Sequence, residues 1–435
     1  GGNRGVSRRA SLNEQMAVPL NAPINRAAIS ALADQQLDWR FKGIPPQWWG
    51  QTSAQIVTQA PELPGAGAIG PMCVLDAEAL THNLGAMADW CRERGVELAP
   101  HGKTHMSPQL AARQLMAGAC GITVATIGQA AVYRAFGVRD LVLANELVDH
   151  AGLQWVASEL DRAEDLRFVC WVDSVRGGGS MTAAPAGARR RVDVCVEVGL
   201  PGGRSGCRSP ETVDEVACAA AASPRLRLVG IAGYEAALGH ELSPEGLGAV
   251  TDHLAELRLA VIRLAGVFET DSVVVSAGGS TYFDAVADTL TGWPDAMSVR
   301  TILRSGCYLT HDHGLYARTS PLTRDGRAGL RPALAVRAQV VSRPEPDLAI
   351  LTMGRRDVSF DQGLPRPLEL PDSAAFRLND QHAFVKLGPG DRSRARVGDW
   401  LRFGVSHPCT VFDKWRLIPV VDSDDRVVDL IHTFF

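Results

Sequence analysis

The stretch Val96–His105 (VELAPHGKTH) joins a short apolar run to a lysine, and the prediction of the fold starts from it. The run Val96–Ala99 is typical of a short buried strand. Pro100 and Gly102 end that strand and leave Lys103 between two histidines at its carboxyl edge. A lysine at such a place is suited to form a Schiff base, because partial burial makes its amine nucleophilic. The alternative at this stage is a solvated loop lysine.

Apolar runs of strand length recur along the chain and predict a barrel. Eight runs are almost entirely apolar, as expected of parallel strands that are buried on both faces: Val96–Ala99, Ile122–Ile127, Leu141–Ala144, Phe168–Val172, Val192–Val198, Leu228–Ala232, Val273–Val275 and Thr301–Leu303. The segments between them are mostly helical, although the Gly- and Ala-rich link Val175–Arg190 is poor in helix signal. Eight strands with helical crossovers favour an α/β fold, a closed (β/α)8 TIM-like barrel, over an open sheet.

The chain on either side of the predicted barrel has a different character. Residues 1–70 are predicted to be an N-terminal extension whose Trp48–Trp49 pair packs against the body or another subunit, and residues 71–317 are assigned to the barrel. Residues 318–435 alternate short apolar runs with Pro, Gly and Asp turns, which predicts a separate C-terminal all-β domain. The run Met72–Asp76 is a further candidate strand of that domain, which would leave the barrel its eight.

Composition narrows the class of protein. The 435 residues are 46% hydrophobic with a formal net charge of −4, which is ordinary for a globular protein and gives no indication of nucleic acid or an anionic membrane as partner. No apolar run reaches the length of a membrane span, and no apolar segment follows the N-terminal arginines as in a secretory signal. Nine cysteines without a CxxC pair indicate reduced thiols and a cytoplasmic protein, and they argue against a zinc ribbon.

The residues that follow the predicted strands test whether Lys103 belongs to a site, because active sites of such barrels lie at the carboxyl ends of the strands. A glycine-rich turn with Arg204 follows the fifth strand, and Tyr234 follows the sixth. The seventh and eighth strands lead into two Gly/Ser-rich loops, which contain Gly278, Gly279 and Ser280, and Gly306 and Tyr308. Neighbouring loops of this kind form an anion cradle, and in barrels they commonly bind phosphate. A lysine with a phosphate cradle predicts pyridoxal 5'-phosphate as cofactor.

A second candidate site lies in the β domain at His407-Pro408-Cys409. Residues two apart in an extended chain point to the same side, and an imidazole with a thiolate suits zinc or a similar ion. A buried histidine beside a buried cysteine is the alternative. His382 is a lesser candidate, for which a surface role is expected.

Five short motifs occur in an order that is typical of one family: Pro100–His105, Glu197–Gly206, Gly278–Thr281, Ser305–Tyr308 and Ser406–Cys409. From about residue 70 to the end, the chain resembles the D-serine dehydratase / D-threonine aldolase family, pyridoxal-phosphate enzymes with an alanine-racemase-like barrel and a C-terminal β domain. The resemblance implies that Lys103 is the Schiff-base lysine and that Ser280, Gly306 and Tyr308 lie near the phosphate. It implies that Arg204 and Tyr234 contact the cofactor ring or its substituents. It also implies a divalent metal bound by His407 and Cys409 beside the cofactor. Zinc is the first choice for this metal, and manganese or another divalent ion is the alternative. Finally, it implies that the protein is a homodimer.

The expected activity is dehydration of a small D-β-hydroxy amino acid, with D-serine as first choice and D-threonine or a β-hydroxy-D-aspartate as other substrates. Lys103 would act as the base that removes the α-proton. Aldol cleavage of D-threonine is the close alternative. In the family the aldolases tend to carry Asp at the second metal position and the dehydratases Cys, so Cys409 favours dehydration.

Two other functions are disfavoured. In alanine racemases a tyrosine of the β domain supplies the second base, and this chain has no tyrosine after Tyr316. A non-catalytic pyridoxal-phosphate carrier would resemble the barrel alone, and the β domain with its His-Pro-Cys motif argues against it.

Overall fold

The computed structural model describes residues 23–63, 67–184, 187–324 and 329–435. The chain divides into two compact units, and each is described by itself. One unit comprises Gly1–Met87, Thr104–Met116 and Cys307–Phe435, and the other comprises Ala88–Lys103 and Ala117–Gly306. Both units are therefore built from segments that are separated in sequence, because the helix α4 (Ala77–Arg94) and three later points carry the chain from one unit to the other.

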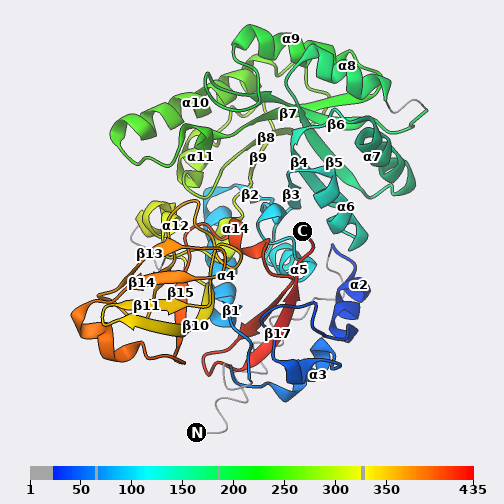
Figure 1. Cartoon of the computed structure of the whole chain (residues 1–435). Coiled ribbons are helices and arrows are strands. Elements are labelled where there is room, and N and C mark those ends of the chain that lie inside the picture. The colour runs from blue at the N-terminus through cyan, green and yellow to red at the C-terminus, as the bar shows by residue number, and fades with distance from the viewer. Residues whose placement is uncertain (1–22, 64–66, 185–186, 325–328) are drawn as a thin grey trace. The chain divides into compact units, whose positions relative to one another are not determined.

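The second unit is an eight-stranded parallel barrel with the strand order β2-β9-β8-β7-β6-β5-β4-β3 (Figure 1). A bridge between His101 and Thr123 joins the first strand to the last, with hydrogen bonds of 3.0 Å from Thr123 N to Pro100 O and 2.8 Å from Cys120 N to Leu98 O. All eight strands expected from the sequence are confirmed: β2 (Glu97–Leu98), β3 (Ile122–Val124), β4 (Asp140–Glu146), β5 (Arg167–Val172), β6 (Val192–Val198), β7 (Leu226–Gly233), β8 (Val273–Ala277) and β9 (Val299–Leu303).

Helices connect these strands and pack on the sheet, for example α9 on β6 and β7. They are α6 (Ile127–Ala135), α7 (His150–Arg162), α8 (Val175–Ala183), α9 (Pro210–Ala221), α10 (Pro244–Arg263) and α11 (Phe283–Thr289). The helix α8 corrects the expectation of a link poor in helix. Glycine lowers its intrinsic propensity, but the Ser174 hydroxyl caps it by accepting from Gly177 N at 3.1 Å, and Met181 is buried.

The first unit contains a nine-stranded sheet, in which the path β13-β14-β11-β10-β1-β16-β17 is joined by β15, and β12 pairs with β15. Strand β1 pairs with β10 antiparallel and with β16 parallel, so the candidate strand before the barrel belongs to this sheet. The strands are β1 (Met72–Asp76), β10 (Leu334–Glu345), β11 (Leu348–Leu351), β12 (Arg366–Pro367), β13 (Ala374–Leu378), β14 (Ala383–Lys386), β15 (Trp400–Gly404), β16 (Leu417–Val421) and β17 (Val427–His432). Strand β13, which the sequence did not indicate, is an edge strand with only Leu378 buried, so it lacks an apolar pattern.

Short helices complete this unit: α2 (Arg26–Ser30), α3 (Ser53–Gln59), α5 (Pro108–Met116), α12 (Leu315–Thr319), α13 (Pro321–Arg324) and α14 (Cys409–Phe412). Trp48 is buried in one apolar cluster with residues of β1, β16 and β17, so the described part of the N-terminal extension packs on this sheet. Its neighbour Trp49 is 43% exposed, and the expected packing of the pair therefore holds only for Trp48. None of the helices in the described parts of the chain combines the length and apolar character needed to cross a membrane.

Candidate active site

Lys103 lies in a short 3-10 turn, Gly102–Thr104, that follows β2. The Tyr133 hydroxyl donates to the Gly102 carbonyl at 2.7 Å, and a Cβ on Gly102 would lie 2.6 Å from the tyrosine ring. Only glycine fits at this position, so Tyr133 fixes the turn that carries the lysine. The Lys103 side chain is exposed, and the partial burial expected from its place at the strand end is not seen.

Three cations gather around His101, two residues before Lys103. Burial of the imidazole lowers the pKa of His101 well below its usual range, and the charges of Lys103, Arg304 and Arg204 lower it further. The carboxyl end of the barrel therefore concentrates positive charge from the loops after β2, β6 and β9. Such a place suits an anionic ligand.

Arg204 and Tyr234 form a stacked pair. The guanidinium carbon lies 4.0 Å from the centroid of the tyrosine ring. Gly279 lies against the same ring, since a Cβ there would be 3.3 Å from Tyr234 Cε2. The structure thus brings together three residues that the sequence assigned to the cofactor.

The two Gly/Ser-rich loops lie side by side, because β8 and β9 are neighbours in the sheet. The Ser305 hydroxyl donates to the Gly279 carbonyl at 2.9 Å. The backbone N–H groups of Gly278 and Gly279, however, donate to the carboxylate of Glu235 at 3.0 and 2.7 Å. Glu235 is fully buried, so these two N–H groups, expected to cradle a phosphate, are held by the protein itself. An anion would therefore have to be held by other groups of the two loops, which include Ser280 and Gly306.

Arg304, which received no role from the sequence, is only 5% exposed. Its Nη1 donates to Ser276 Oγ at 2.6 Å, and its Nη2 donates to the Gly233 carbonyl at 2.8 Å. Burial lowers the pKa of Arg304, while the charges of Glu235 and Glu197 oppose that shift. The position of Arg304 directly after the eighth strand was the only feature of the sequence that could have indicated a role for it.

Carboxylates also meet at this end of the barrel. Burial, a hydrogen bond to Glu197 and the charges of Glu197 and Asp173 raise the pKa of Glu146 to about 8. Glu146 ends β4, Asp173 follows β5, and Glu197 lies near the end of β6. A carboxyl group that keeps its proton at neutral pH is a mark of functional sites rather than of ordinary surface.

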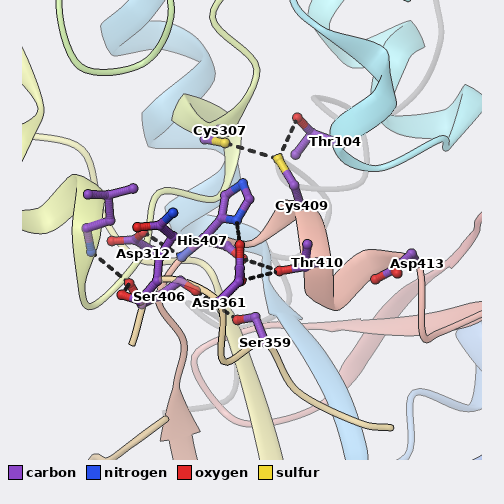
Figure 2. Close-up of polar contacts among 12 residues, drawn as sticks. Thr104, Cys307, Asp312, Ser359, Asp361, Ser406, His407, Cys409, Thr410 and Asp413 are labelled. Atoms are coloured by element: carbon purple, nitrogen blue, oxygen red, sulfur yellow. Dashed lines mark hydrogen bonds and ion pairs between the residues drawn. The ribbon is translucent and has the colours of Figure 1, made fainter. Parts of the chain in front are cut away.

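The first unit holds a cluster of possible metal ligands, Cys307, His407 and Cys409, whose ligand atoms all lie within 4.8 Å of one another. Figure 2 shows the three side chains converging. The sulfur atoms of Cys307 and Cys409 are 3.4 Å apart, and the Cys409 sulfur lies 3.3 Å from Thr104 Oγ1. The structure therefore brings together the His407–Cys409 pair expected from the sequence and adds a third residue, Cys307.

His407 is held from two directions. Its backbone has a left-handed conformation (φ 67°), and its N–H donates to Asp312 Oδ2 at 2.9 Å. Its ring Nδ1 lies 2.6 Å from Asp361 Oδ2, and Thr410 Oγ1 donates to the other oxygen of that carboxylate at 2.7 Å (Figure 2). A carboxylate accepts hydrogen bonds, so Nδ1 carries a proton and Nε2 is the nitrogen left for a metal.

The charges within the cluster are strongly coupled. Hydrogen bonds from Cys307, His407 and Thr104 outweigh burial and lower the pKa of Cys409 well below its usual range. The pKa of Cys307 is raised, foremost by the same bond to Cys409. Burial alone would lower the pKa of His407, but Cys409 and Asp361 raise it to about 9. Without an ion, this coupling favours a thiolate at Cys409 beside a charged imidazole at His407, so His407 would have to release its Nε2 proton on binding a metal.

Two remaining candidates have different surroundings. Tyr308 is buried in the first unit, where its hydroxyl accepts from Gln114 Nε2 at 3.2 Å. His382 is exposed and does not belong to the cluster of possible ligands. Asp361 and Asp312, which orient His407, lie 46 and 95 residues away from it in sequence, so no motif could have indicated them.

Comparison with known proteins defines the class first. The family model "Alanine racemase, N-terminal domain" matches residues 75–300, which identifies the barrel as that of the fold-type III pyridoxal-phosphate enzymes. A second model, "Putative serine dehydratase domain", matches residues 333–421 in the β-sheet unit.

Individual relatives narrow this class. A D-threonine aldolase from an Arthrobacter species is 30% identical over 346 residues, covering 79% of this chain and 86% of the relative. The D-threo-3-hydroxyaspartate dehydratase of Delftia sp. (strain HT23) is 29% identical over 382 residues, covering 82% and 95%. A crystal structure of D-threonine aldolase from Filomicrobium marinum has the same fold, with a TM-score of 0.73 at 24% identity over 84% of this chain and 95% of that one. The chain belongs to the D-serine dehydratase / D-threonine aldolase family.

Proposed function

We propose that this protein is a pyridoxal-phosphate- and metal-dependent lyase that removes water from a small D-β-hydroxy amino acid, with D-serine as the first substrate and pyruvate and ammonia as products. The observation that carries dehydration is the thiol of Cys409 among the metal donors, where family aldolases tend to have an aspartate. Membership in a family of D-hydroxy amino acid lyases supports the general reaction class.

The residues at the carboxyl end of the barrel fit pyridoxal phosphate. The cations of Lys103, Arg204 and Arg304 around His101 suit its negative charge, and groups of the Gly/Ser-rich loops other than the N–H groups of Gly278 and Gly279 would hold its phosphate. The cofactor, when bound, supplies an electron sink for negative charge at the substrate's α-carbon. Lys103 would hold the cofactor through its amine, and after the substrate amine replaces it, Nζ would take the α-proton. Tyr133 keeps the turn of Lys103 in place for both roles.

The donor cluster fits a borderline or soft divalent ion such as zinc. His407 would bind through Nε2, because Asp361 engages Nδ1. The ion, when bound, would supply a Lewis acid for the substrate's hydroxyl oxygen. Thr104, whose hydroxyl lies beside the Cys409 sulfur, directly follows Lys103 in the chain.

Retro-aldol cleavage of D-threonine is the second candidate, and the 30% identity to a D-threonine aldolase favours it. Cleavage would need a base for the substrate hydroxyl instead of the α-carbon. The same cofactor and metal residues would serve both reactions, so the products have to decide between them.

Product analysis tests the proposal. The protein is purified, supplied with pyridoxal phosphate and zinc, and given D-serine, D-threonine and D-threo-3-hydroxyaspartate in separate reactions. Pyruvate from D-serine and 2-oxobutanoate from D-threonine are the expected products. Glycine with acetaldehyde would overturn dehydration in favour of the aldolase, and bound cofactor without any turnover would favour a carrier. Chelation should stop turnover while the cofactor stays bound.

The residue that separates the two reactions can be tested by substitution. Cys409→Asp should raise the ratio of cleavage to dehydration products, whereas His407→Ala should abolish both reactions. An unchanged product ratio in Cys409→Asp would remove the argument for dehydration.

The quaternary structure and compartment are proposed from the resemblance and the thiol content. We expect a homodimer in the cytoplasm. Light scattering coupled to size exclusion would contradict the dimer if it gave the monomer mass of 46.5 kDa.

A further inference from the structure

A third sulfur belongs to the cluster around His407. Cys307 comes from the loop after β9, 102 residues before Cys409, yet the two sulfur atoms are 3.4 Å apart. Cys307 is 5% exposed and packs with Leu315 and Tyr316 in an apolar cluster that Cys409 joins. An apolar surrounding limits access of water and strengthens the hold of a thiolate on a cation.

The spacing of the sulfurs fits a shared metal ion. Two thiolates at about 2.3 Å from a tetrahedral zinc lie roughly 3.8 Å apart. A disulfide, by contrast, would need the sulfurs to approach to about 2.05 Å. The 3.4 Å separation differs from the metal-bound value by a few tenths of an ångström and from the disulfide by more than one.

The two segments that carry these residues are tied to each other. Asp312, which is 1% exposed, accepts on Oδ2 from the backbone of His407 and on Oδ1 from Gly314 and Tyr316. The backbone N–H of His311 donates to the Cys307 carbonyl at 2.7 Å, which fixes the turn of that cysteine. The loop after β9 and the His407–Cys409 segment therefore hold fixed positions relative to each other, and little reorganisation would be needed to bind an ion.

We infer that Cys307 is a third protein ligand, which makes the site a Cys2His set with one position of a tetrahedron left for a substrate oxygen. This inference rests on the proposal that His407 and Cys409 hold the catalytic metal. Two thiolates select zinc over manganese or magnesium, because harder ions favour oxygen donors. Three protein ligands and one open position are the usual arrangement of catalytic zinc.

X-ray absorption of the zinc-loaded holoprotein counts the sulfur ligands directly and does not depend on turnover. We expect two sulfur scatterers at about 2.3 Å, with the remaining ligands nitrogen or oxygen. One sulfur would overturn the role of Cys307 and leave the His407–Cys409 pair intact. No sulfur would overturn both this inference and the proposed metal site.

Affinity measurements on variants provide the second test. Cys307→Ser should weaken zinc binding on the order of 100-fold in a chelator competition, while manganese binding changes by less than about threefold. Cys73→Ala removes another buried thiol of the same unit and should leave both affinities unchanged. Equal zinc affinity in Cys307→Ser and the wild type would overturn the inference. Circular dichroism checks that Cys307→Ser is folded, and if it is not, the sulfur count of the wild type decides.

Discussion

The two ends of the barrel use their charged residues in opposite ways. At the amino ends of the strands, three ion pairs join neighbouring strands: Arg227 with Asp193 through two bonds of 2.7 Å, Arg300 with Glu97 at 2.7 and 2.8 Å, and Arg167 with Asp140. At the carboxyl ends, Arg204 stacks on Tyr234, and Arg304 donates to a hydroxyl and a carbonyl.

The pKa values follow the same division. At the carboxyl ends, the pKa of Glu146 is raised to about 8 and that of His101 is strongly lowered. At the amino ends, the hydrogen bond to its aspartate partner raises the pKa of Arg227, which only reinforces its charge. The contrast separates paired charges on exposed strand starts, which contribute little to stability, from the perturbed groups at strand ends, which we propose bind a ligand. Four substitutions test this division.

Lys103→Ala should have the largest effect. Turnover should fall by at least about 10⁴-fold, because the variant loses both the anchor of the cofactor and the α-proton base. The visible absorbance of lysine-bound pyridoxal phosphate should disappear at the same time. Lys386→Ala, at an exposed surface ion pair, is the control and should keep both properties. A surviving absorbance band would show that another lysine holds the cofactor.

Glu235→Gln should weaken cofactor binding. The glutamine has one oxygen where the carboxylate accepts two backbone N–H groups, so the loop of Gly278 and Gly279 loses a charge-assisted bond. We expect the dissociation constant of pyridoxal phosphate, measured by absorbance titration of the apoprotein, to rise about tenfold. The exposed Glu245→Gln should leave it unchanged. An unaltered constant in Glu235→Gln would mean that this loop does not hold the cofactor.

Glu146→Gln should change how stability depends on pH. The folded protein keeps a proton on Glu146 up to about pH 8, whereas the unfolded chain releases it near the ordinary value of 4.5. Stability of the wild type therefore falls as the pH rises between these two values, and glutamine, which cannot ionise, removes that loss. The Tm of the variant should exceed that of the wild type by roughly 2 to 4 °C at pH 8, and by less at pH 5. A difference independent of pH, or one also seen in the exposed Glu164→Gln, would contradict the raised pKa.

Arg227→Gln should have the smallest effect. The pair with Asp193 is 44% and 24% exposed, so its loss should cost less than about 1 kcal/mol of unfolding free energy, and less still in high salt. The kcat/KM should stay at the wild-type value. A loss of turnover at constant stability would break the distinction between the two ends of the barrel.

Most of the fold could be predicted because its elements follow from apolar patterns. Strand β6 begins and ends where the sequence predicts, since it is a nearly continuous run of buried residues. The helix α8 could not be predicted, because its glycines disfavour a helix and the cap of Ser174 and the barrel packing compensate only in the folded chain. The edge strand β13 was missed because four of its five residues are not buried.

The candidate site divides in the same way. Lys103, Arg204 and the Gly/Ser-rich loops could be found because each belongs to a loop that follows a strand. Cys307, Glu235 and Asp361 could not, because their partners Cys409, Gly278 and His407 lie 102, 43 and 46 residues away. Only the folded chain shows that the carboxylate of Glu235 accepts from the backbone N–H groups of Gly278 and Gly279, which the sequence motif assigned to a phosphate.

The way the chain passes between its two units limits how the protein can be dissected. Two of the four boundaries fall between Lys103 and Thr104 and between Gly306 and Cys307, next to the proposed cofactor lysine and one proposed metal ligand. No single cut yields either unit whole, because Thr104–Met116 and the N-terminal strand β1 belong with the C-terminal sheet. In a chimera that takes only residues 318–435 from a relative, Cys307 would come from this protein, whereas the residues at positions 407 and 409 would come from the relative. Grafts meant to transfer the reaction of an aldolase or a dehydratase should therefore carry residues 104–116 and 307–317 along with the C-terminal segment.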